Sequence, residues 1–333
     1  MYIFGLPNSV IRESQSCWIK KVQANSVKFA DPFVTAAGKE RAYSSLRNPT
    51  TLWFNTGTLC NIECVNCYIK SSPENDSLVY LTAEEVERYL RQISHRGWPV
   101  REIGFTGGEP FMNPQFLAMV TAALINNFDV LILTNAMRPM MRKPVQWKLL
   151  QLRERFDRRL TLRVSLDHYS QAVHDAERGA DGFAKTLDGL IWLKEHGFRL
   201  AVAGRGSPTE SESDLRNGFR GLFERYEIPV NASDPSQLVI FPELEADAEV
   251  PEISTECWGL LKKSPNTVMC SSSRMVIKRK GATSPSVVAC TLLPYQREFE
   301  LGESLAEAER DVRLNHPNCA AFCVLGGASC SPA

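Results

Sequence analysis

The sequence lacks an excess of charge of either sign. Its 333 residues include 38 Lys and Arg and 38 Asp and Glu, so the formal net charge is zero. A protein that binds a phosphate-rich polymer generally carries a basic patch or tail. The balanced composition, with no basic tail or stripe, argues against DNA or RNA as the substrate, and we expect no nucleic-acid partner.

The chain also lacks a long apolar run. No hydrophobic stretch approaches the roughly twenty residues that span a bilayer, so we expect no membrane partner. The N-terminus, MYIFGLPNSVIRESQS, does not have the charged segment followed by an apolar segment that is typical of a secretory signal. Together these features predict a cytoplasmic protein.

Cysteine, in contrast, is plentiful. The chain has ten cysteines and is 44% hydrophobic, which is ample for a buried core without disulfides. Cys60, Cys64 and Cys67 follow a strand-like segment at 51–56 with the spacing C-x3-C-x2-C. This spacing can place three thiolates around one metal centre, and it favours metal binding in a reducing compartment. Zinc and an iron–sulfur cluster both accept such ligands.

A glycine-containing segment follows the triad in the sequence. The sequence EIGFTGGEP at 102–110 predicts a short strand that ends in a Gly107-Gly108 turn. Adjacent glycines let the backbone approach a ligand closely, and Glu109 can accept hydrogen bonds from an ammonium group. If the metal is a four-iron cluster, three cysteines leave its fourth iron open to such a ligand. A zinc site remains the alternative.

The triad and the GGEP turn together resemble the signature of the radical S-adenosylmethionine (SAM) enzymes. The resemblance implies that Cys60, Cys64 and Cys67 hold a [4Fe-4S] cluster that binds SAM and cleaves it reductively to a 5'-deoxyadenosyl radical. It also implies a flavodoxin- or ferredoxin-type electron donor. Family members often have an aromatic residue just before the third cysteine. Here Asn66 occupies that position and Tyr68 follows the cysteine, which affects the usual adenine contact but not the cluster.

Strand-like and helical segments alternate along most of the chain. Strands are expected at 51–56, 102–106, 130–135, 160–167, 199–203 and 238–241, and helices at 82–94, 114–126, 144–155, 183–196 and 212–226. Such alternation is typical of βα units around a parallel sheet. Six units match the partial (β/α)6 barrel of the radical SAM family, so the predicted fold class is α/β.

This pattern divides the chain into three parts. We predict an N-terminal lead-in at 1–50 packed on the barrel, a radical SAM core at 51–245, and a small cysteine-rich Twitch-like extension at 246–333. Thr82 and Glu85 have the order of a capping box and predict the start of the first helix of the core.

Polar residues stand at the predicted C-terminal strand ends, where parallel βα barrels carry their chemistry. Such residues also favour turns for backbone reasons alone. The resemblance implies that SAM is bound from this edge. The residues that we assign to cofactor binding are Tyr68, Thr106, Gly107, Gly108, Glu109, Asn135, Ser165 and Arg205.

The segment at 165–198 resembles the SPASM and Twitch group of the family, in which a loop that ends in arginine and glycine precedes a helix that begins with phenylalanine. Arg178 and Phe183 take these positions. His168 stands where the group often has glycine, so we name His168 and Asp167 as candidate catalytic residues. A histidine titrates near neutral pH and can carry a proton. A packing or surface histidine is the plain alternative.

Six of the remaining cysteines lie between Cys257 and Cys330, a concentration that is hard to attribute to packing. The set resembles a Twitch domain, which implies a second, auxiliary [4Fe-4S] cluster that flanks a predicted hairpin. A zinc site is the alternative, and Cys17 and Cys257 are interpreted as buried thiols. The assigned ligands are Cys270, Cys290, Cys319 and Cys323, with Cys330 as a rival for either of the last two places.

These features predict a radical SAM enzyme with an electron-transferring auxiliary cluster. The lead-in of about fifty residues is too short and too unpatterned to include the peptide-recognition domain that many peptide-modifying relatives carry. A small molecule is therefore the first choice of substrate, and a peptide or protein side chain is the second. A non-catalytic iron–sulfur or zinc scaffold is the alternative of another class. The GGEP turn argues against it, because a scaffold needs no ligand-chelating loop beside an open iron.

Overall fold

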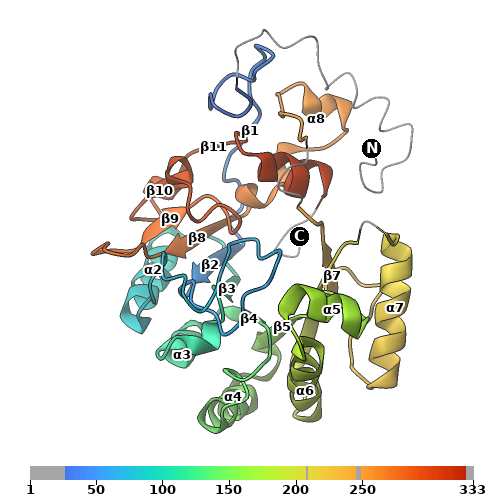
Figure 1. Ribbon diagram of the computed structural model, residues 1–333. Helices are drawn as coiled ribbons and strands as arrows, with labels where there is room; N and C mark the ends of the chain where they lie inside the picture. The colour runs from blue at the N-terminus through green and yellow to red at the C-terminus, as the bar shows by residue number, and fades with distance from the viewer. Residues whose placement is uncertain (1–26, 208, 245–248, 328–333) are drawn as a thin grey trace.

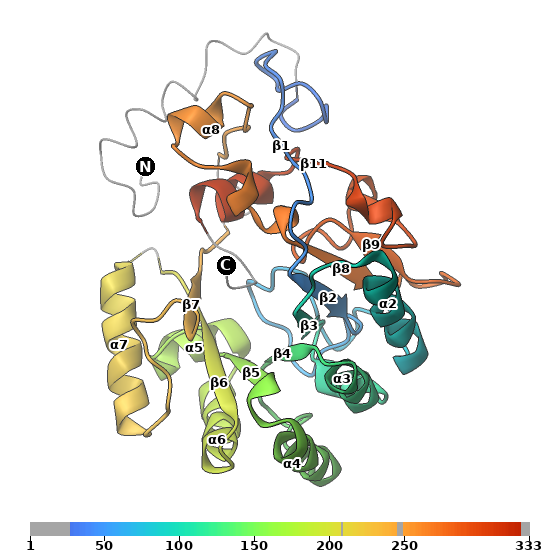
Figure 2. The ribbon, with the colours of Figure 1, turned by 180° about the vertical axis from the view of Figure 1, so that it is seen from behind.

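A computed structural model describes residues 27–207, 209–244 and 249–327. Nine strands form one curved sheet in the order β10-β9-β8-β2-β3-β4-β5-β6-β7. Helices α2, α3, α4, α6 and α7 lie on the outer side of its curve (Figures 1 and 2). The concave side therefore holds the space that a barrel-type fold uses for ligands.

Six adjacent strands of this sheet confirm the predicted partial barrel. Strands β2 to β7 are all parallel to their neighbours. Their bounds are Thr51–Asn55, Glu102–Thr106, Asp129–Thr134, Leu160–Ser165, Arg199–Arg205 and Leu238–Phe241. The helices after β2 to β6 that the sequence predicts are α2 (Ala83–Arg96), α3 (Phe116–Ile125), α4 (Lys143–Phe156), α6 (Gly182–Glu195) and α7 (Glu212–Arg225).

Local sequence signals explain the element ends. Thr82 caps α2 and forms the reciprocal capping box with Glu85, and Gly97 ends the helix in the left-handed conformation. The apolar interior depends on longer-range fit. Trp53 of β2 lies opposite Gly104 of β3. A Cβ at Gly104 would come within 2.4 Å of the Trp53 ring, so the large Trp53 side chain fits only because Gly104 has no side chain.

Helix α5 (Gln171–Arg178) was not predicted, since the sequence was interpreted there as a loop before the longer helix α6. A helix of this length has little intrinsic stability and depends on tertiary packing. Its buried anchor is His174, which packs edge-to-face against Phe183 of α6 with ring centroids 5.7 Å apart. The helix therefore forms because of its neighbour, not because of its own periodicity.

The C-terminal hairpin continues the barrel sheet. Strand β8 (Ser273–Ile277) pairs in parallel with β2, and it pairs antiparallel with β9 (Ser286–Val288), which pairs with β10 (Glu300–Gly302). The hairpin was expected at 275–280 and 287–290, but its attachment to the edge of β2 was not. The boundary predicted at residue 246 separates two parts of the chain that share one sheet.

The described part of the lead-in, residues 27–50, contacts the C-terminal part of the chain. Strand β1 (Tyr43–Ser44) pairs with β11 (Val312–Arg313), and Arg41 forms a buried salt bridge with Glu252. This differs from the expectation that residues 1–50 pack on the barrel. Residues 1–26, which include Cys17, lie outside the described residues.

Short elements complete the C-terminal region and the connections. Helix α8 spans Cys257–Leu260, and a π-helix, η7, spans Cys319–Leu325. The short 3-10 turns are η1 (Pro110–Met112), η2 (Asp157–Arg159), η3 (Pro265–Thr267), η4 (Met269–Ser271), η5 (Arg297–Phe299) and η6 (Glu307–Glu309).

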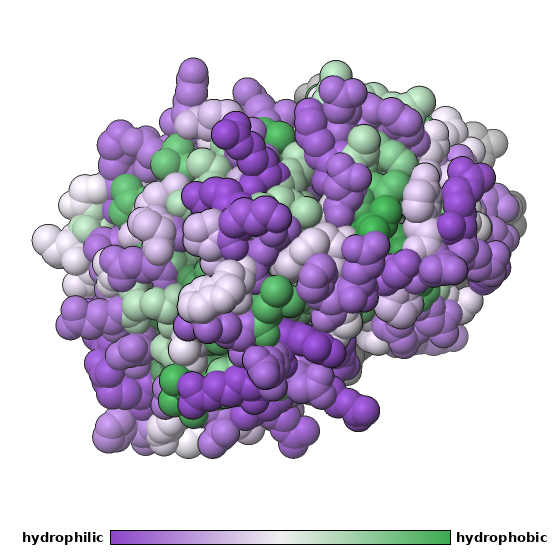
Figure 3. All heavy atoms as spheres, turned by 90° about the horizontal axis from the view of Figure 1, so that it is seen from below, coloured by the Kyte–Doolittle hydropathy of each residue, from purple (hydrophilic) through white to green (hydrophobic). Residues whose placement is uncertain are grey.

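In the described part of the chain, none of the helices has both the length and the apolar character needed to cross a bilayer. The face in Figure 3 is mostly hydrophilic, and its hydrophobic side chains lie in small, separate patches.

Burial of His174 makes the stability of the fold depend on pH. The side chain is fully buried, and neither ring nitrogen has a hydrogen-bond partner. Burial, helped by the nearby Arg178 charge, lowers the pKa of His174 to about 4. Its pKa in the unfolded chain is about 6.5. The protonated form is therefore favoured in the unfolded state, and stability is lost as the pH falls from about 6.5 to about 4.

We expect His174→Leu to remove this loss. Between pH 7 and pH 5 the wild type should lose roughly 2 kcal/mol more unfolding free energy than the variant, from a pKa difference worth about 1.4 kcal/mol per unit. Denaturation in urea at both pH values measures the effect, and His95→Leu, at an exposed position, is the control. An equal pH response in wild type and His174→Leu would contradict the prediction.

Candidate functional site

An open cavity of about 1050 Å³ lies at the C-terminal ends of the barrel strands. All three triad cysteines line it, as do seven of the eight residues that the sequence assigns to SAM binding. Those seven are Tyr68, Thr106, Gly107, Gly108, Asn135, Ser165 and Arg205. The fold therefore brings segments far apart in the sequence to one site, as expected for a parallel sheet whose strand ends share an edge.

The triad loop presents three free thiols to this cavity. Cys60 is buried, and Cys64 and Cys67 are half-buried. Burial raises the pKa of Cys60 to about 12 and also raises the pKa of Cys64. Thiolates are unfavourable here without a cation, so metal binding at this loop must be coupled to the release of protons.

The two glycines of the GGEP turn let it dock directly on the triad loop. The Gly108 amide donates to the Gly57 carbonyl at 2.8 Å, and the Glu109 amide donates to the Leu59 carbonyl at 3.1 Å. A Cβ at Gly108 would lie 2.2 Å from the Leu59 carbonyl oxygen. The sequence predicted a close approach of this turn to a ligand. In the structure the turn approaches the backbone of the triad loop and supports it.

Glu109 is the assigned SAM-binding residue that is not among those lining the cavity. It is buried and accepts hydrogen bonds from the Thr134 hydroxyl and the Asn135 amide, both at 2.9 Å. Burial raises the pKa of Glu109 to about 7. The sequence placed this carboxylate on an ammonium group of the ligand. In the structure it joins the GGEP turn to the end of β4 and positions Asn135.

A buried ion-pair cluster forms the opposite wall. Arg178 donates to both carboxylate oxygens of Asp167, at 2.7 and 3.0 Å, and the Arg205 Nε lies 3.9 Å from the same carboxylate. Burial alone would raise the pKa of Asp167, but the Arg178 guanidinium outweighs it and holds that pKa below its usual range. Asp167 is therefore an anionic anchor for two arginines and is poorly suited to donate a proton.

Arg178 is the site residue that sequence analysis missed. Its position in the loop before α6 was recognised, but only as part of a family pattern. The structure places it on the cavity wall. Two guanidinium groups share one carboxylate there, which leaves a net positive charge for an anionic part of a ligand.

Arg205 has unused donors beside the cavity. Its Nε and Nη1 atoms are buried and have no hydrogen-bond partner, and its guanidinium lies 4.7 Å from the centroid of the Tyr68 ring. Buried donors are nearly always satisfied, and leaving them unpaired is costly. A carboxylate such as that of SAM matches this charge and these donors.

His168 does not line the cavity. It is buried, its Nδ1 accepts from the Ser170 amide at 2.9 Å, and its Nε2 lies 3.4 Å from the Glu210 carboxylate. Its ring stacks on Tyr169 with centroids 4.2 Å apart. This geometry corresponds to the packing alternative and not to the substrate-facing role that the sequence suggested.

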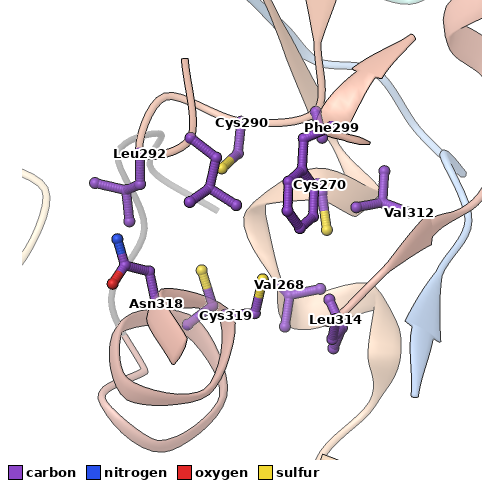
Figure 4. A pocket seen from close by; sticks show the side chains of 12 residues that line it. Val268, Cys270, Cys290, Leu292, Phe299, Val312, Leu314, Asn318 and Cys319 are labelled. Carbon is purple, nitrogen blue, oxygen red and sulfur yellow. The ribbon is translucent and has the colours of Figure 1, made fainter. Parts of the chain in front are cut away.

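A second, smaller cavity of about 380 Å³ collects the four C-terminal cysteines that the sequence assigned as ligands: Cys270, Cys290, Cys319 and Cys323. In Figure 4 the sulfur atoms of Cys270, Cys290 and Cys319 border one space. Apart from Asn318, the rest of the wall is apolar and includes Val268, Leu293, Phe299, Val312 and Leu314. A buried apolar wall around free thiols suits a cluster shielded from solvent.

The other C-terminal cysteines contribute nothing to this cavity in the described chain. Cys257, interpreted from the sequence as a core thiol, is fully buried and disulfide-bonded. Cys330 lies outside the described residues.

The two cavities are adjacent. Leu292 lines both of them, and Thr291 lines the large one. A ring contact also joins the two cysteine sets, since Tyr68, which follows Cys67, lies edge-on to Phe322 of η7 with centroids 5.9 Å apart. The geometry thus places the second thiol set directly behind the wall of the large cavity.

Zinc and an iron–sulfur cluster both accept free thiols as ligands. Within the ranges that the structure describes, no three or more His, Cys, Asp or Glu side chains are already arranged to hold one metal ion.

The family model for the radical SAM superfamily matches residues 54–218. This range contains the triad, the GGEP turn and strands β3 to β6, which line the large cavity. The chain belongs to the radical SAM superfamily. Its C-terminal cysteines also agree with the SPASM and Twitch type of radical SAM protein.

Two curated proteins are similar to this radical SAM chain. The antilisterial bacteriocin subtilosin biosynthesis protein AlbA of Bacillus subtilis (strain 168) is 32% identical over 145 residues, which are 43% of this chain and 30% of AlbA. The mycofactocin maturase MftC of Mycobacterium ulcerans (strain Agy99) is 26% identical over 187 residues, 56% of this chain and 47% of MftC. The chain spans less than half the length of each.

Two solved structures share the radical SAM fold at low identity. Native anSMEcpe with bound AdoMet has a TM-score of 0.57 and 16% identity, and the match covers 78% of this chain and 80% of that one. Streptococcus suis SuiB bound to S-adenosylmethionine has a TM-score of 0.56 and 12% identity, with coverage of 77% and 63%. Identity at this level supports the fold and no finer statement.

Arg205 provides a test of ligand binding in the large cavity. We expect Arg205→Met to weaken SAM binding by roughly tenfold to a hundredfold, because a hydrogen bond to a charged group contributes about 1.5–3 kcal/mol. Equilibrium dialysis with reconstituted protein measures the dissociation constant. Arg199→Met, at the exposed start of the same strand, is the matched control. Equal affinities of the wild type and Arg205→Met for SAM would show that Arg205 does not bind SAM.

Proposed function

We propose that this chain is a radical SAM enzyme that modifies a peptide or protein side chain, with an auxiliary [4Fe-4S] cluster beside its SAM site. The observation that carries the proposal is the adjacency of two cavities, one lined by the triad and one by four further thiols, with Leu292 common to both. A scaffold that only binds metal gains nothing from this arrangement.

Each cavity has the donor set for its group. Cys60, Cys64 and Cys67 would hold the SAM-binding cluster, and the four C-terminal thiols would hold the auxiliary one. When bound, the first cluster and SAM supply a 5'-deoxyadenosyl radical able to take hydrogen from an unreactive carbon. Four thiolates saturate a four-iron cluster, which suits electron transfer better than substrate binding.

The protein's own residues bind and orient the reactants. Arg205 offers unpaired donors to a carboxylate, and the Arg178–Asp167 pair keeps the neighbouring positive charge in place. Glu109 fixes the GGEP turn to β4, so Asn135 is held at the cavity wall. Positioned groups of this kind lower the entropic cost of reaction without taking part in the bond changes.

The substrate class rests on the relatives. AlbA takes part in the biosynthesis of a bacteriocin, and MftC is a maturase. These points favour the second substrate choice made from the sequence, a peptide, over the small molecule placed first.

The test uses the reconstituted protein, SAM and dithionite in place of a flavodoxin- or ferredoxin-type donor. The probe is a short peptide encoded beside the gene, and the control is the matching mixture of its free amino acids. We expect peptide-dependent formation of 5'-deoxyadenosine and a mass change in the peptide, with neither from the mixture. Turnover of the free amino acids alone would restore the small-molecule hypothesis. No 5'-deoxyadenosine above a Cys64→Ala background would favour the scaffold.

A further inference from the structure

Arg274 of β8 is a fully buried arginine beside the auxiliary cavity. Its guanidinium is held entirely by backbone carbonyl groups. The Nε donates to Ala308 at 2.9 Å, the Nη2 donates to Arg310 at 3.2 Å, and the Nη1 donates to Ser273 at 2.9 Å and also to Cys270. These contacts fix the position of the guanidinium. They do not neutralise its positive charge, because carbonyl groups carry no net charge.

The charge of Arg274 has no carboxylate partner in the described part of the chain. The Asp311 carboxylate acts electrostatically on Arg274, but it is exposed, and its effect is smaller than that of the Cys270 and Cys290 thiols. Two other arginines of this region do have a carboxylate partner: Arg41 pairs with Glu252 at the lead-in, and Arg279 pairs with Glu300 at the far end of the same hairpin. A buried charge without a counter-charge is strongly unfavourable, so the location of Arg274 calls for an anion.

In the described part of the chain, the ligand thiols of the cavity are the groups that face Arg274 most closely. Cys270 lies four residues before Arg274 in sequence, and its carbonyl accepts a hydrogen bond from the guanidinium. Arg274 acts electrostatically on Cys270, and both Cys270 and Cys290 act on Arg274. An arginine guanidinium stays protonated in proteins, so the side chain is charged at neutral pH.

We propose that Arg274 is the fixed counter-cation of the auxiliary cluster and raises its reduction potential. The inference rests on the auxiliary cluster of the proposed function. Four thiolates around a four-iron core carry a net negative charge, and reduction by one electron makes it more negative. A buried cation at fixed distance stabilises the reduced state more than the oxidised state, because the interaction grows with the charge of the cluster and is little screened.

A second cation strengthens the electrostatic argument. Lys263 is half-buried, donates to the Val324 carbonyl, and is influenced by Cys323 on the other side of the cavity. Its exposure to solvent makes its effect weaker, because water screens the charge. Arg274 is therefore the dominant local cation for the thiols of the hairpin.

The experiment is an anaerobic potentiometric titration of the full chain with both clusters, followed by electron paramagnetic resonance. The barrel cluster is recognised because added SAM changes its signal, and its potential serves as an internal reference. Arg274→Gln removes the charge, and Arg274→Lys keeps the charge without the guanidinium hydrogen bonds. Arg279→Gln removes a paired charge from the same hairpin as a matched control. Iron content is measured for every variant.

We expect Arg274→Gln to lower the reduced-to-oxidised ratio of the auxiliary cluster at a fixed potential by about tenfold, which for one electron corresponds to about 59 mV. Arg274→Lys and Arg279→Gln should stay near the wild type, and the barrel cluster should not shift. Loss of the auxiliary cluster from Arg274→Gln but not from Arg274→Lys would also support the proposal, since the charge is then required for the cluster to be held.

Three results would overturn the inference. These are an unchanged potential in Arg274→Gln, equal shifts in the Gln and Lys variants, or loss of the cluster from both, which would give Arg274 a structural role only. A wild-type protein with one cluster, shown by about four irons and a single signal, would instead refute the auxiliary cluster of the proposed function. The two failures are therefore distinguishable.

Discussion

Replacing Cys64 by alanine should reduce 5'-deoxyadenosine formation to background. Cys64 is one of three thiols on the wall of the large cavity, and two thiolates from one loop are too few to retain a four-iron cluster in an ordered position. The iron content should fall by about half, because the auxiliary cavity lies on a different part of the chain. The product is measured by chromatography after incubation with SAM and dithionite, together with iron and sulfide analysis.

Val65→Ala is a suitable control for this variant. Val65 is next to Cys64 on the same loop, and its side chain is 74% exposed, so the substitution should change neither the iron content nor the product. SAM cleavage at the wild-type rate by Cys64→Ala would show that the triad does not hold the reactive cluster. A loss of activity in Val65→Ala would point to a general sensitivity of the loop.

Replacing Cys270 and Cys290 together by alanine should separate the two halves of the chemistry. The variant should lose about half of its iron and still cleave SAM, because the triad loop is supported by the GGEP turn and not by the hairpin cysteines. It should fail to complete the modification of the peptide if the auxiliary cluster transfers electrons. Iron analysis, 5'-deoxyadenosine formation and the mass of the peptide measure these effects separately.

The stability of this double variant must be known before its activity is interpreted. The four thiols come from β8, β9 and η7 or their flanking residues, so a bound cluster ties the hairpin to the C-terminal segment and contributes to folding. Circular dichroism checks the fold, and Cys64→Ala, which should lose the other half of the iron, is the reciprocal control. A folded double variant with full iron and normal product would make these cysteines packing residues.

The arrangement of charge around the large cavity suggests how affinity and chemistry are divided. The Arg178–Asp167 pair is buried and geometrically strong, with two hydrogen bonds, whereas Arg205 keeps two donors unpaired. Removing one partner of a buried pair leaves an uncompensated charge and costs several kcal/mol. Substitutions at Asp167 are thus expected to act on folding as well as on ligand binding, and Arg205 is the cleaner probe of the site.

Much of the fold and of the candidate site could be predicted from the sequence, because their signals are local. The alternation of apolar strands and helices indicated six βα units, and Thr82 with Glu85 predicted the start of α2, which the structure confirms. Parallel strands place their C-terminal ends at one edge. This is why residues assigned from separate motifs, such as Gly107, Asn135 and Ser165, line one cavity.

Other features were decided by tertiary structure alone, because they depend on which distant group a side chain meets. The Glu109 carboxylate accepts hydrogen bonds from Thr134 and Asn135, donors at the end of β4 that no local sequence pattern pairs with it. Strand β8 joins the edge of β2, and the lead-in joins β11, through backbone pairing that no local pattern encodes. The sequence by itself determined the barrel and its two cysteine sets; only packing decided that Leu292 separates them and that an unpaired Arg274 lies beside the second.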